Sequence, residues 1–566
     1  MINNIIYSQI LRRLLKSKES YIAMWLITCI SSFMFFFVQS SIDANRQNDL
    51  IEKFEDLVVA LDSNTILART FLILFMFILA FLYYMFFHKF IKNEARAFGC
   101  FISLGIEVKT LKKIYFNIVG FTVITSTIVG NVLGYIFSDI LLNNYIINYG
   151  VMDLKKGLAF SNIFMGYMFP IITVLIVAFI NVHSFFYRDI IDLLDYKDEK
   201  NLITIKVSNY ISKFFSGNFA FGMRIAFRKP FYLFMIIGAI FIFGTLFLFS
   251  ISLNVSSNIA QGNLLIGRNY EYEIKFDYMK NLFNSNIDSE EISYIIETEA
   301  SLIYKDEEIS QICYGIEPEK KLFQLIDNDN SIIDLKEGQI IISPRISLIL
   351  GINKGDNITI NINGNTYQFQ VQGVGVNAYN NGIYLLKTDL VKMFPELLDT
   401  YNLVYTNLNL DVTDGVVISK DIIRENIDRE NVSNRISAVI CQALAVIVGT
   451  LLLFLAIFMN FEENHNNILR LNILGYNSKE INSMIVSIYE PIIIIGFLIM
   501  IYPTVLIGKK ISILLSMQTG DYIPFYTDIW VVILNFIFIF ILYIVIKSIF
   551  TWKIKKINDE NKLLKS

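Results

Sequence analysis

The sequence contains eight long apolar stretches, and this feature limits what the chain can fold into more than any other. A helix needs about 20 apolar residues to cross the hydrocarbon core of a bilayer, and each stretch reaches that length. The expected spans are about residues 21–41, 65–87, 114–136, 163–186, 231–253, 438–459, 481–507 and 529–549. Only 17% of the residues are charged, against about 25% in soluble proteins. We therefore predict a polytopic membrane protein that is mainly α-helical.

One long segment, residues 254–437, contains no such stretch and holds most of the acidic residues. Within it, Ile358, Ile360 and Ile362 alternate with polar residues, as in a half-buried strand. The Asn363-Gly364 pair that follows is typical of a two-residue hairpin turn. The sequence therefore predicts an α+β domain inserted in the second half of a membrane protein.

Basic residues cluster on alternate loops, for example at Lys89, Lys92 and Arg96 after the second expected span. Loops rich in lysine and arginine stay on the cytoplasmic side. This pattern predicts cytoplasmic N- and C-termini in a plasma membrane, with the large inserted domain outside. Lys509 and Lys510 depart from the pattern, and long side chains at the end of a span can reach the interface.

The expected division of the chain follows from these spans. Residues 1–20 alternate basic and apolar positions in a helical rhythm, which is typical of an amphipathic helix in the membrane surface. We expect the parts to be a lead-in helix (1–20), a first four-span half (21–187), a cytoplasmic linker with a second lead-in helix (188–230), a fifth span (231–253), an extracytoplasmic domain (254–437), spans six to eight (438–551) and a cytoplasmic tail (552–566).

A short motif recurs after the second and sixth spans, which indicates an internal repeat of two four-span halves. Residues 99–105 and residues 469–475 both end in Leu-Gly, and each leads through a short polar stretch into a long apolar helix. That following helix is expected to end near Gly134 in the first half and near Gly508 in the second. Glycine caps a helix in the left-handed conformation that other residues resist. A short, sharply capped cytoplasmic helix suits the groove of a soluble partner; the alternative is a plain turn between spans.

With these features the chain resembles the FtsX-like permeases of ATP-binding-cassette (ABC) systems, including the MacB type. In that family a short coupling helix ending in Leu/Ile-Gly docks on the ATPase. The resemblance implies coupling helices that contain Arg96, Phe98, Gly99, Leu104 and Gly105 in the first half and Arg470, Leu474 and Gly475 in the second.

The motif departs from the family pattern in two respects. The family usually has a glutamate two residues before the first glycine, where this chain has Ala97 and Asn467, and Leu469 replaces that glycine in the second half. The acidic residues nearby are Glu94, Glu462 and Glu463.

The inserted domain adds a second likeness. Residues 339–360, followed by residues 365–374, are similar to the family's extracytoplasmic module, in which a helix ending in Leu-Gly leads to Lys-Gly-Asp and two strands. A small outer segment in the first half and a large domain in the second resemble the bacitracin-resistance (BceB-type) permeases. Those permeases usually carry an extra pair of spans between the halves, and residues 187–229 are too polar to supply them.

The sequence contains no motif for catalysis. It has no phosphate-binding loop and no His-Glu-x-x-His zinc motif, so ATP and Mg²⁺ are expected on a separate ATPase and not on this chain. The cysteine spacing predicts no disulfide framework, and we expect no metal site and no nucleic-acid partner. Glu490, near the start of the seventh span, is a candidate functional acid because charged groups in membrane helices are costly. The alternative is that its carboxylate is solvated at the cytoplasmic interface.

These features, with the resemblance, predict the permease subunit of an ABC system. It relays motion of an ATPase dimer to the outer domain, for export, removal or sensing of antimicrobial peptides or lipids. The implied partners are the ATPase, membrane lipid, a peptide or lipid ligand and, in a sensing system, a sensor histidine kinase. One alternative is a receptor that controls a signalling or cell-wall partner without transport. Another is a system that extracts lipoproteins or lipids.

Overall fold

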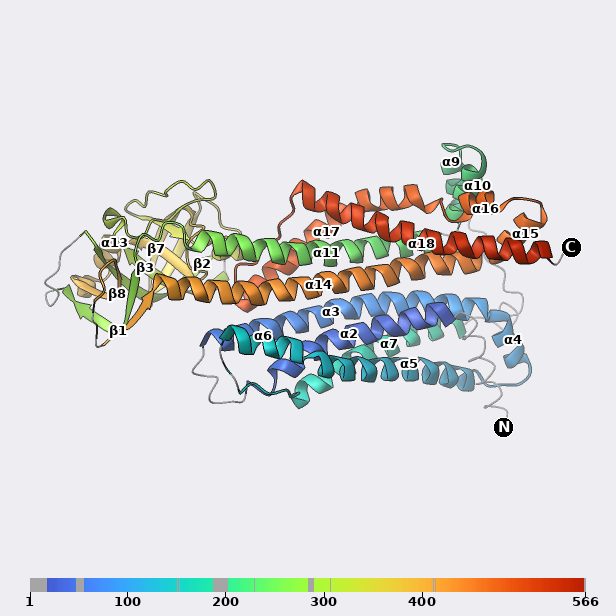
Figure 1. The fold of residues 1–566 in the computed structure, drawn as a ribbon, viewed down its shortest axis with the longest axis horizontal. Helices are drawn as coiled ribbons and strands as arrows, with labels where there is room; N and C mark the ends of the chain where they lie inside the picture. The colour runs from blue at the N-terminus through green and yellow to red at the C-terminus, as the bar shows by residue number, and fades with distance from the viewer. Residues whose placement is uncertain are drawn as a thin grey trace. The chain divides into compact units, whose positions relative to one another are not determined.

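The computed structural model describes residues 18–46, 55–149, 151, 153–186, 202–228, 230–282, 290–305, 307–410, 412 and 414–563 (Figure 1). The chain divides into two compact units. The helical unit contains Met1–Leu248, Ile440–Ile507 and Thr527–Ser566, and the β-rich unit contains Phe249–Val439 and Gly508–Tyr526. Most of the expected lead-in helix at residues 1–20 lies outside the described residues.

The long helices of the first half pack against one another in the helical unit (Figure 1). They are α2 (Lys18–Ile42), α3 (Glu55–Asn93), α5 (Val108–Phe137) and α7 (Phe160–Phe186), with the shorter α6 (Asp139–Tyr149) after α5. Two glycines of α5 let it lie close to α2: a Cβ at Gly130 would sit 2.5 Å from the Cys29 carbonyl oxygen, and one at Gly134 would sit 2.8 Å from that of Phe33. Small residues allow such close contact between helices in membranes.

The long helices of the second half are α11 (Pro230–Leu264), α14 (Lys420–Glu463), α17 (Tyr489–Thr519) and α18 (Ile529–Leu563). Aromatic side chains fill the space between them. The rings of Phe247 and Phe538 are 4.9 Å apart, and the Phe243 ring lies where a side chain on Gly449 would be. The two halves meet where Lys89 of α3 donates to the Met459 carbonyl oxygen of α14 and lies 3.5 Å from Glu462.

Eight helices among the described residues are long and apolar enough to cross a membrane, as the sequence predicts. The shorter helices of the helical unit are α4 (Ala95–Ser103), α9 (Leu202–Ser212), α10 (Gly217–Arg228), α15 (His465–Ile473) and α16 (Ser478–Ile485). Together with the β-rich region between α11 and α14, this is the architecture of a multi-pass membrane protein with an inserted domain.

The seventh expected span lies within a candidate span, Ser478–Thr519, but its helix is interrupted near its start. Helix α16 ends at Ile485 and α17 begins at Tyr489. Proline at position 491 has no N–H and its ring would clash with the Ser487 carbonyl in a continuous helix. Starting a new helix at Tyr489 places Pro491 in the first turn, where neither problem arises.

The described residues of the β-rich unit form nine strands. They are β1 (Tyr272–Asn281), β2 (Ile292–Tyr304), β3 (Glu307–Ile316), β4 (Gln339–Ile342), β5 (Asn357–Ile362), β6 (Asn365–Val374), β7 (Gly382–Leu386), β8 (Thr400–Thr406) and β9 (Val416–Ser419). Strand order is β3-β7-β4-β6-β5-β2-β8-β1-β9, and β2 also pairs with β3. That pairing closes six strands into a ring, from which β8, β1 and β9 extend in that order.

The ring encloses an aliphatic core that includes Leu302, Ile340, Ile358 and Leu385. The hairpin predicted at Asn363-Gly364 is confirmed: Ile362 pairs with Asn365, and the two turn residues have φ of 51° and 84°. Positive φ at both positions is the requirement of a type I′ turn. Two short helices, α12 (Pro344–Leu350) and α13 (Lys387–Met393), lie beside the strands.

Candidate functional site

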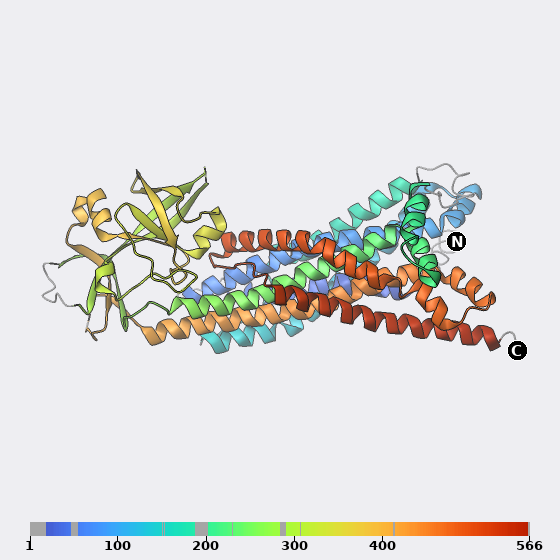
Figure 2. The ribbon, with the colours of Figure 1, turned by 90° about the horizontal axis from the view of Figure 1, so that it is seen from above.

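Helices α4 and α15 occupy corresponding places in the two halves. Each has nine residues, each follows the long helix before it after a single turn residue, Glu94 or Asn464, and each leads through Leu-Gly to the next helix. Figures 1 and 2 show both at the same end of the helical unit. The repeat therefore presents two similar short helices on one end of the membrane bundle.

The two helices also end in the same hydrogen-bonding pattern. After α4, Ile106 N–H donates to Phe101 O at 3.1 Å and Gly105 N–H to Ile102 O at 3.0 Å. After α15, the corresponding bonds run from Tyr476 to Leu471 and from Gly475 to Asn472, both at 3.1 Å. This is the Schellman motif, which needs a left-handed residue after the last helical turn.

The two glycines are required by the backbone and not by lack of space. Gly105 has φ of +88° and Gly475 has φ of +92°, and a Cβ at either position would meet no atom within 4 Å. A glycine adopts this conformation at no steric cost. The cap turns the chain sharply and leaves the preceding leucine at the tip of the bend.

Each short helix has one anchored face and one free face. In α4, Phe98 and Gly99 are buried, and the Phe98 ring lies edge-on to Phe185 of α7, with 6.2 Å between centroids. Arg96 and Gly105 are exposed, and Leu104 is 78% exposed. A large apolar side chain held out on a fixed turn is typical of an anchor for a partner's pocket.

Helix α15 repeats this arrangement with different residues. Ile468 and Leu471 are buried, whereas Arg470 and Gly475 are exposed and Leu474 is 73% exposed. Sequence reasoning missed the two buried residues, Ile468 and Leu471, that hold α15 against the protein. Their three-residue spacing on a short helix, between polar positions, was a usable signal.

The remaining site candidate, Glu490, lies at the break between α16 and α17. It is in the first turn of α17, where a carboxylate interacts favourably with the positive end of the helix dipole. Its carboxylate is paired with Lys547 of α18. The Tyr543 hydroxyl, also on α18, donates at 2.9 Å to the Val486 carbonyl oxygen within the break.

The first turn of α16 is fixed by side-chain capping. Asn477 accepts from the Glu480 N–H at 3.0 Å, while the Glu480 carboxylate accepts from the Asn477 N–H at 2.9 Å, which forms a capping box. Near the end of α16, the Thr551 hydroxyl of α18 contacts Asn482 Oδ1 at 3.0 Å. Helix α16 is thus a short rod between α15 and the break, and α18 fixes the angle at which it meets α17.

On the expectation from the sequence that a separate ATPase drives the chain, Glu490→Gln should lower ATPase coupling several-fold without loss of protein, because it removes the ionic contact between α17 and α18 at the break. The charge-reversed pair, Glu490→Lys with Lys547→Glu, is expected to recover part of the activity. The measurement is ligand-dependent ATPase rate in the reconstituted complex, with protein level followed by immunoblot. Unchanged coupling in Glu490→Gln would leave the carboxylate as a solvated interface residue.

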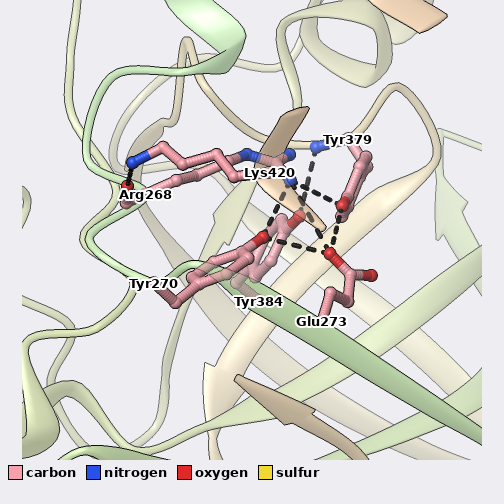
Figure 3. A network of polar contacts seen from close by, with 6 residues as sticks. All are labelled: Arg268, Tyr270, Glu273, Tyr379, Tyr384 and Lys420. Atoms are coloured by element: carbon pink, nitrogen blue, oxygen red, sulfur yellow. Dashed lines mark hydrogen bonds and ion pairs between the residues drawn. The ribbon is translucent and has the colours of Figure 1, made fainter. Parts of the chain in front are cut away.

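A second polar cluster lies in the β-rich unit, where Arg268 is only 2% exposed (Figure 3). Its Nη1 donates to the Tyr270 hydroxyl at 2.9 Å and to the Tyr379 hydroxyl at 2.6 Å. Both hydroxyls donate to Glu273 Oε2, at 3.0 and 2.9 Å, and Arg268 Nη1 lies 3.9 Å from the same oxygen. The guanidinium also lies over the Tyr379 ring, 4.2 Å from its centroid.

This cluster joins segments that are far apart in sequence. Arg268 lies between α11 and β1, and Glu273 is on β1. Tyr379 lies just before β7, and its backbone N–H donates at 3.1 Å to the hydroxyl of Tyr384, which is on β7. Lys420, the first residue of α14, donates its Nζ to the Arg268 carbonyl oxygen at 2.7 Å and its backbone N–H to the Glu271 carbonyl oxygen at 2.8 Å. The segment after α11 and the start of α14 are therefore bound to one buried network.

Comparison with known families agrees with the architecture of the second half. Residues 439–558, from α14 to α18, match the model of the FtsX-like permease C-terminal domain. The C-terminal part of this chain is an FtsX-like permease domain. Such permeases are non-catalytic membrane subunits that work with an ABC ATPase. The matched range of this permease includes Arg470, Leu474, Gly475 and Glu490, and α4 lies outside it. No curated protein matches the chain significantly.

Proposed function

We propose that this permease relays the motion of a separate ATPase dimer, which binds ATP and Mg²⁺, to the β-rich unit. The observation that carries the proposal is the pair of short helices with identical caps, each presenting an exposed leucine at the same end of the helical unit. A dimeric ATPase offers two equivalent grooves, and two equivalent helices on one face fit that symmetry.

The elements that follow each short helix provide a route for the motion. In the first half, α4 leads through Gly105 directly into α5. In the second half, α15 leads through Gly475 into α16 and then, across the break at Val486–Ile488, into α17. Helix α14 is a single helix of 44 residues that begins at Lys420 in the β-rich unit and ends at Glu463, just before α15. Continuous backbone hydrogen bonding makes a helix a suitable rod for transmitting displacement.

For the ligand, we propose an antimicrobial peptide or a lipid that is exported, removed from the membrane or sensed. The spans expose large apolar side chains such as Phe164 and Leu498, which suit contact with lipid better than a hydrophilic pore. The BceB-type arrangement of a small first segment and a large second one supports the same ligand class, with the β-rich unit outside the cell.

Thiol labelling tests this topology. Cys100 of α4 is exposed, whereas Cys313 is buried, and its burial raises the pKa of the thiol to about 12, so that it stays unreactive. We expect a membrane-impermeant maleimide to label Thr366→Cys, beside the hairpin turn, in intact cells. Cys100 should react only after permeabilisation. Labelling of both thiols from the same side would contradict the relay.

The function itself is tested with the full permease and its ATPase reconstituted in nanodiscs. Addition of a membrane-active peptide antibiotic is expected to raise the ATPase rate, and expression of the complex is expected to protect growth. Stimulation without protection would favour a receptor that acts through a sensor kinase. Co-purification of bound lipid or lipoprotein, with no response to peptides, would favour extraction.

A further inference from the structure

The α9–α10 hairpin of the helical unit presents a surface that the proposed relay does not use. Helix α9 ends at Ser212 and α10 begins at Gly217, so a tight turn joins them. Arg224 Nη2 on α10 lies 3.4 Å from the Ser212 hydroxyl, and the two helices pack against each other. The hairpin is therefore a defined structure and not two independent segments.

One side of the hairpin is anchored to the permease domain. Gly222, Met223 and Ala226 form the buried side of α10. A Cβ at Gly222 would lie 2.3 Å from the Met484 carbonyl oxygen of α16, so the two backbones are in close contact. This contact fixes which side of the hairpin faces away from the protein.

The other side is both basic and aromatic. Lys206 and Tyr210 lie one turn apart on α9, Lys213 follows directly after the helix, and all three are exposed. Phe214, in the turn after α9, is 71% exposed, and its ring lies 5.5 Å from that of Tyr210. Phe221 continues the exposed aromatic surface on α10.

The charge on this surface has one sign. Between residues 202 and 228 the chain contains the cations Lys206, Lys213, Arg224 and Arg228, all exposed, and no acidic residue. A soluble partner that covered this surface would have to match both exposed rings and unbalanced positive charge. A lipid surface with anionic headgroups provides both complements at once.

The position of the hairpin in the chain agrees with that partner. Helix α10 ends at Arg228, and α11, whose membrane-spanning part is Leu233–Val255, begins at Pro230. The hairpin is thus separated from a membrane span by only a few residues. Aromatic rings are enriched at this depth, where their apolar bodies and polar edges meet both environments.

We propose that the α9–α10 hairpin binds the anionic phospholipid surface, with Tyr210, Phe214 and Phe221 inserted at the headgroup boundary and the four cations on lipid phosphates. Because α10 is packed on α16, this binding anchors the rod that follows coupling helix α15. The surface and its ligand class do not depend on the identity of the transported molecule.

Depth measurement with a spin label tests the proposal in the full chain. A nitroxide is attached at Phe214→Cys in a Cys100→Ser background, in nanodiscs of phosphatidylcholine with or without phosphatidylglycerol. In discs with phosphatidylglycerol we expect the label to be accessible to oxygen and protected from a water-soluble nickel reagent. Leu474→Cys, an exposed apolar position on the coupling turn, is the matched control and is expected to stay accessible to nickel in both lipids.

Removal of two positive charges from the hairpin is the second part of the experiment. Each lysine near an anionic surface contributes about fivefold to binding, so Lys206→Gln with Lys213→Gln should raise the ratio of water-exposed to embedded label by more than tenfold. A label equally exposed in both lipids would overturn the proposal. So would equal embedding without phosphatidylglycerol, or protection that appears only when the ATPase is added, which would assign the surface to a protein partner. Tyr210→Cys repeats the measurement at a second position.

Discussion

Replacement of Leu104 or Leu474 with serine is expected to weaken binding of the ATPase about thirtyfold at each site, while the permease stays folded. Truncation of an apolar anchor at the centre of an interface costs about 2 kcal/mol or more, which corresponds to this factor. Both leucines lie at the tip of a glycine-capped turn and are mostly exposed, so neither contributes to the core. The stability of the free chain should therefore change by less than about 0.5 kcal/mol.

The measurement is the affinity of the purified ATPase for the permease in nanodiscs, together with its ATPase rate. Leu398→Ser is the matched control, because Leu398 is 61% exposed but lies in the β-rich unit after β7 and α13. It should bind the ATPase like the unmodified chain. If the double variant Leu104→Ser/Leu474→Ser retained normal affinity, the short helices would be turns between spans and the partner would bind elsewhere.

The features that sequence reasoning predicted correctly depend on local backbone chemistry. The Asn363-Gly364 turn requires positive φ at two adjacent residues, and few residue pairs adopt it readily. Helix length and apolar composition similarly identify spans without knowledge of their neighbours. These signals are contained in a short window of sequence, so they can be read before the fold is known.

The break before α17 was also encoded locally, but its signal was overridden by apolar composition. Residues 481–507 are apolar enough to be taken as one span, and they contain two prolines. The helix starts again just before Pro491 but continues through Pro503. The consequence, that Tyr543 contacts Val486 and Lys547 pairs with Glu490, depends on α18, which is more than fifty residues away along the chain. The partner of Glu490 could not be inferred from its own surroundings.

The role of Gly508 also depends on residues that its local sequence does not show. The sequence predicts that the long helix of the second half ends near it, whereas α17 continues to Thr519. A Cβ at Gly508 would lie 2.2 Å from the Phe525 ring, so the residue is needed for packing and not for termination. A glycine in an apolar helix has either role, and only the fold distinguishes them.

The Arg268 cluster was not predictable at all, because its members come from four separate segments. Residues 268–273 follow α11, Tyr379 and Tyr384 belong to the β7 region, and Lys420 starts α14. Tyr405, whose ring stacks on that of Tyr270 with 4.2 Å between centroids, is on β8. Only the folded β-rich unit brings them together. In sequence, Arg268 is one cation in a polar domain, and a cation of that kind is usually a solvated surface residue.

Substitution of Arg268 by methionine is expected to lower the free energy of unfolding of the β-rich unit by about 3 to 5 kcal/mol. Removal of one member of a buried ion pair leaves the other charge without compensation, and Glu273 is itself only 8% exposed. Burial raises the pKa of Tyr379 to about 12, so its hydroxyl stays protonated and continues to donate to Glu273. The hydrogen bonds from Tyr379 and Tyr270 compensate only part of the Glu273 charge that the Arg268 guanidinium compensates.

Hydrogen exchange of the full chain in nanodiscs measures this loss. Amides of β8, such as Leu403 and Tyr405, are in the core and should exchange about a hundredfold faster or more in Arg268→Met. The double variant Arg268→Met/Glu273→Gln should recover part of the protection, because it removes the uncompensated charge. Lys275→Met is the control: Lys275 pairs with Glu297 at 2.7 Å on the surface, with its side chain 53% exposed, and such a pair is worth less than about 1 kcal/mol.

A further variant, Lys420→Met, distinguishes a structural role of the cluster from a role in the relay. Lys420→Met removes the Nζ bond to the Arg268 carbonyl oxygen but leaves the buried Arg268–Glu273 pair intact. If the network transmits the displacement of α14, Lys420→Met should lower ligand-dependent ATPase stimulation while β8 exchange changes little. Faster β8 exchange in Arg268→Met with normal coupling in Lys420→Met would restrict the cluster to holding the β-rich unit together.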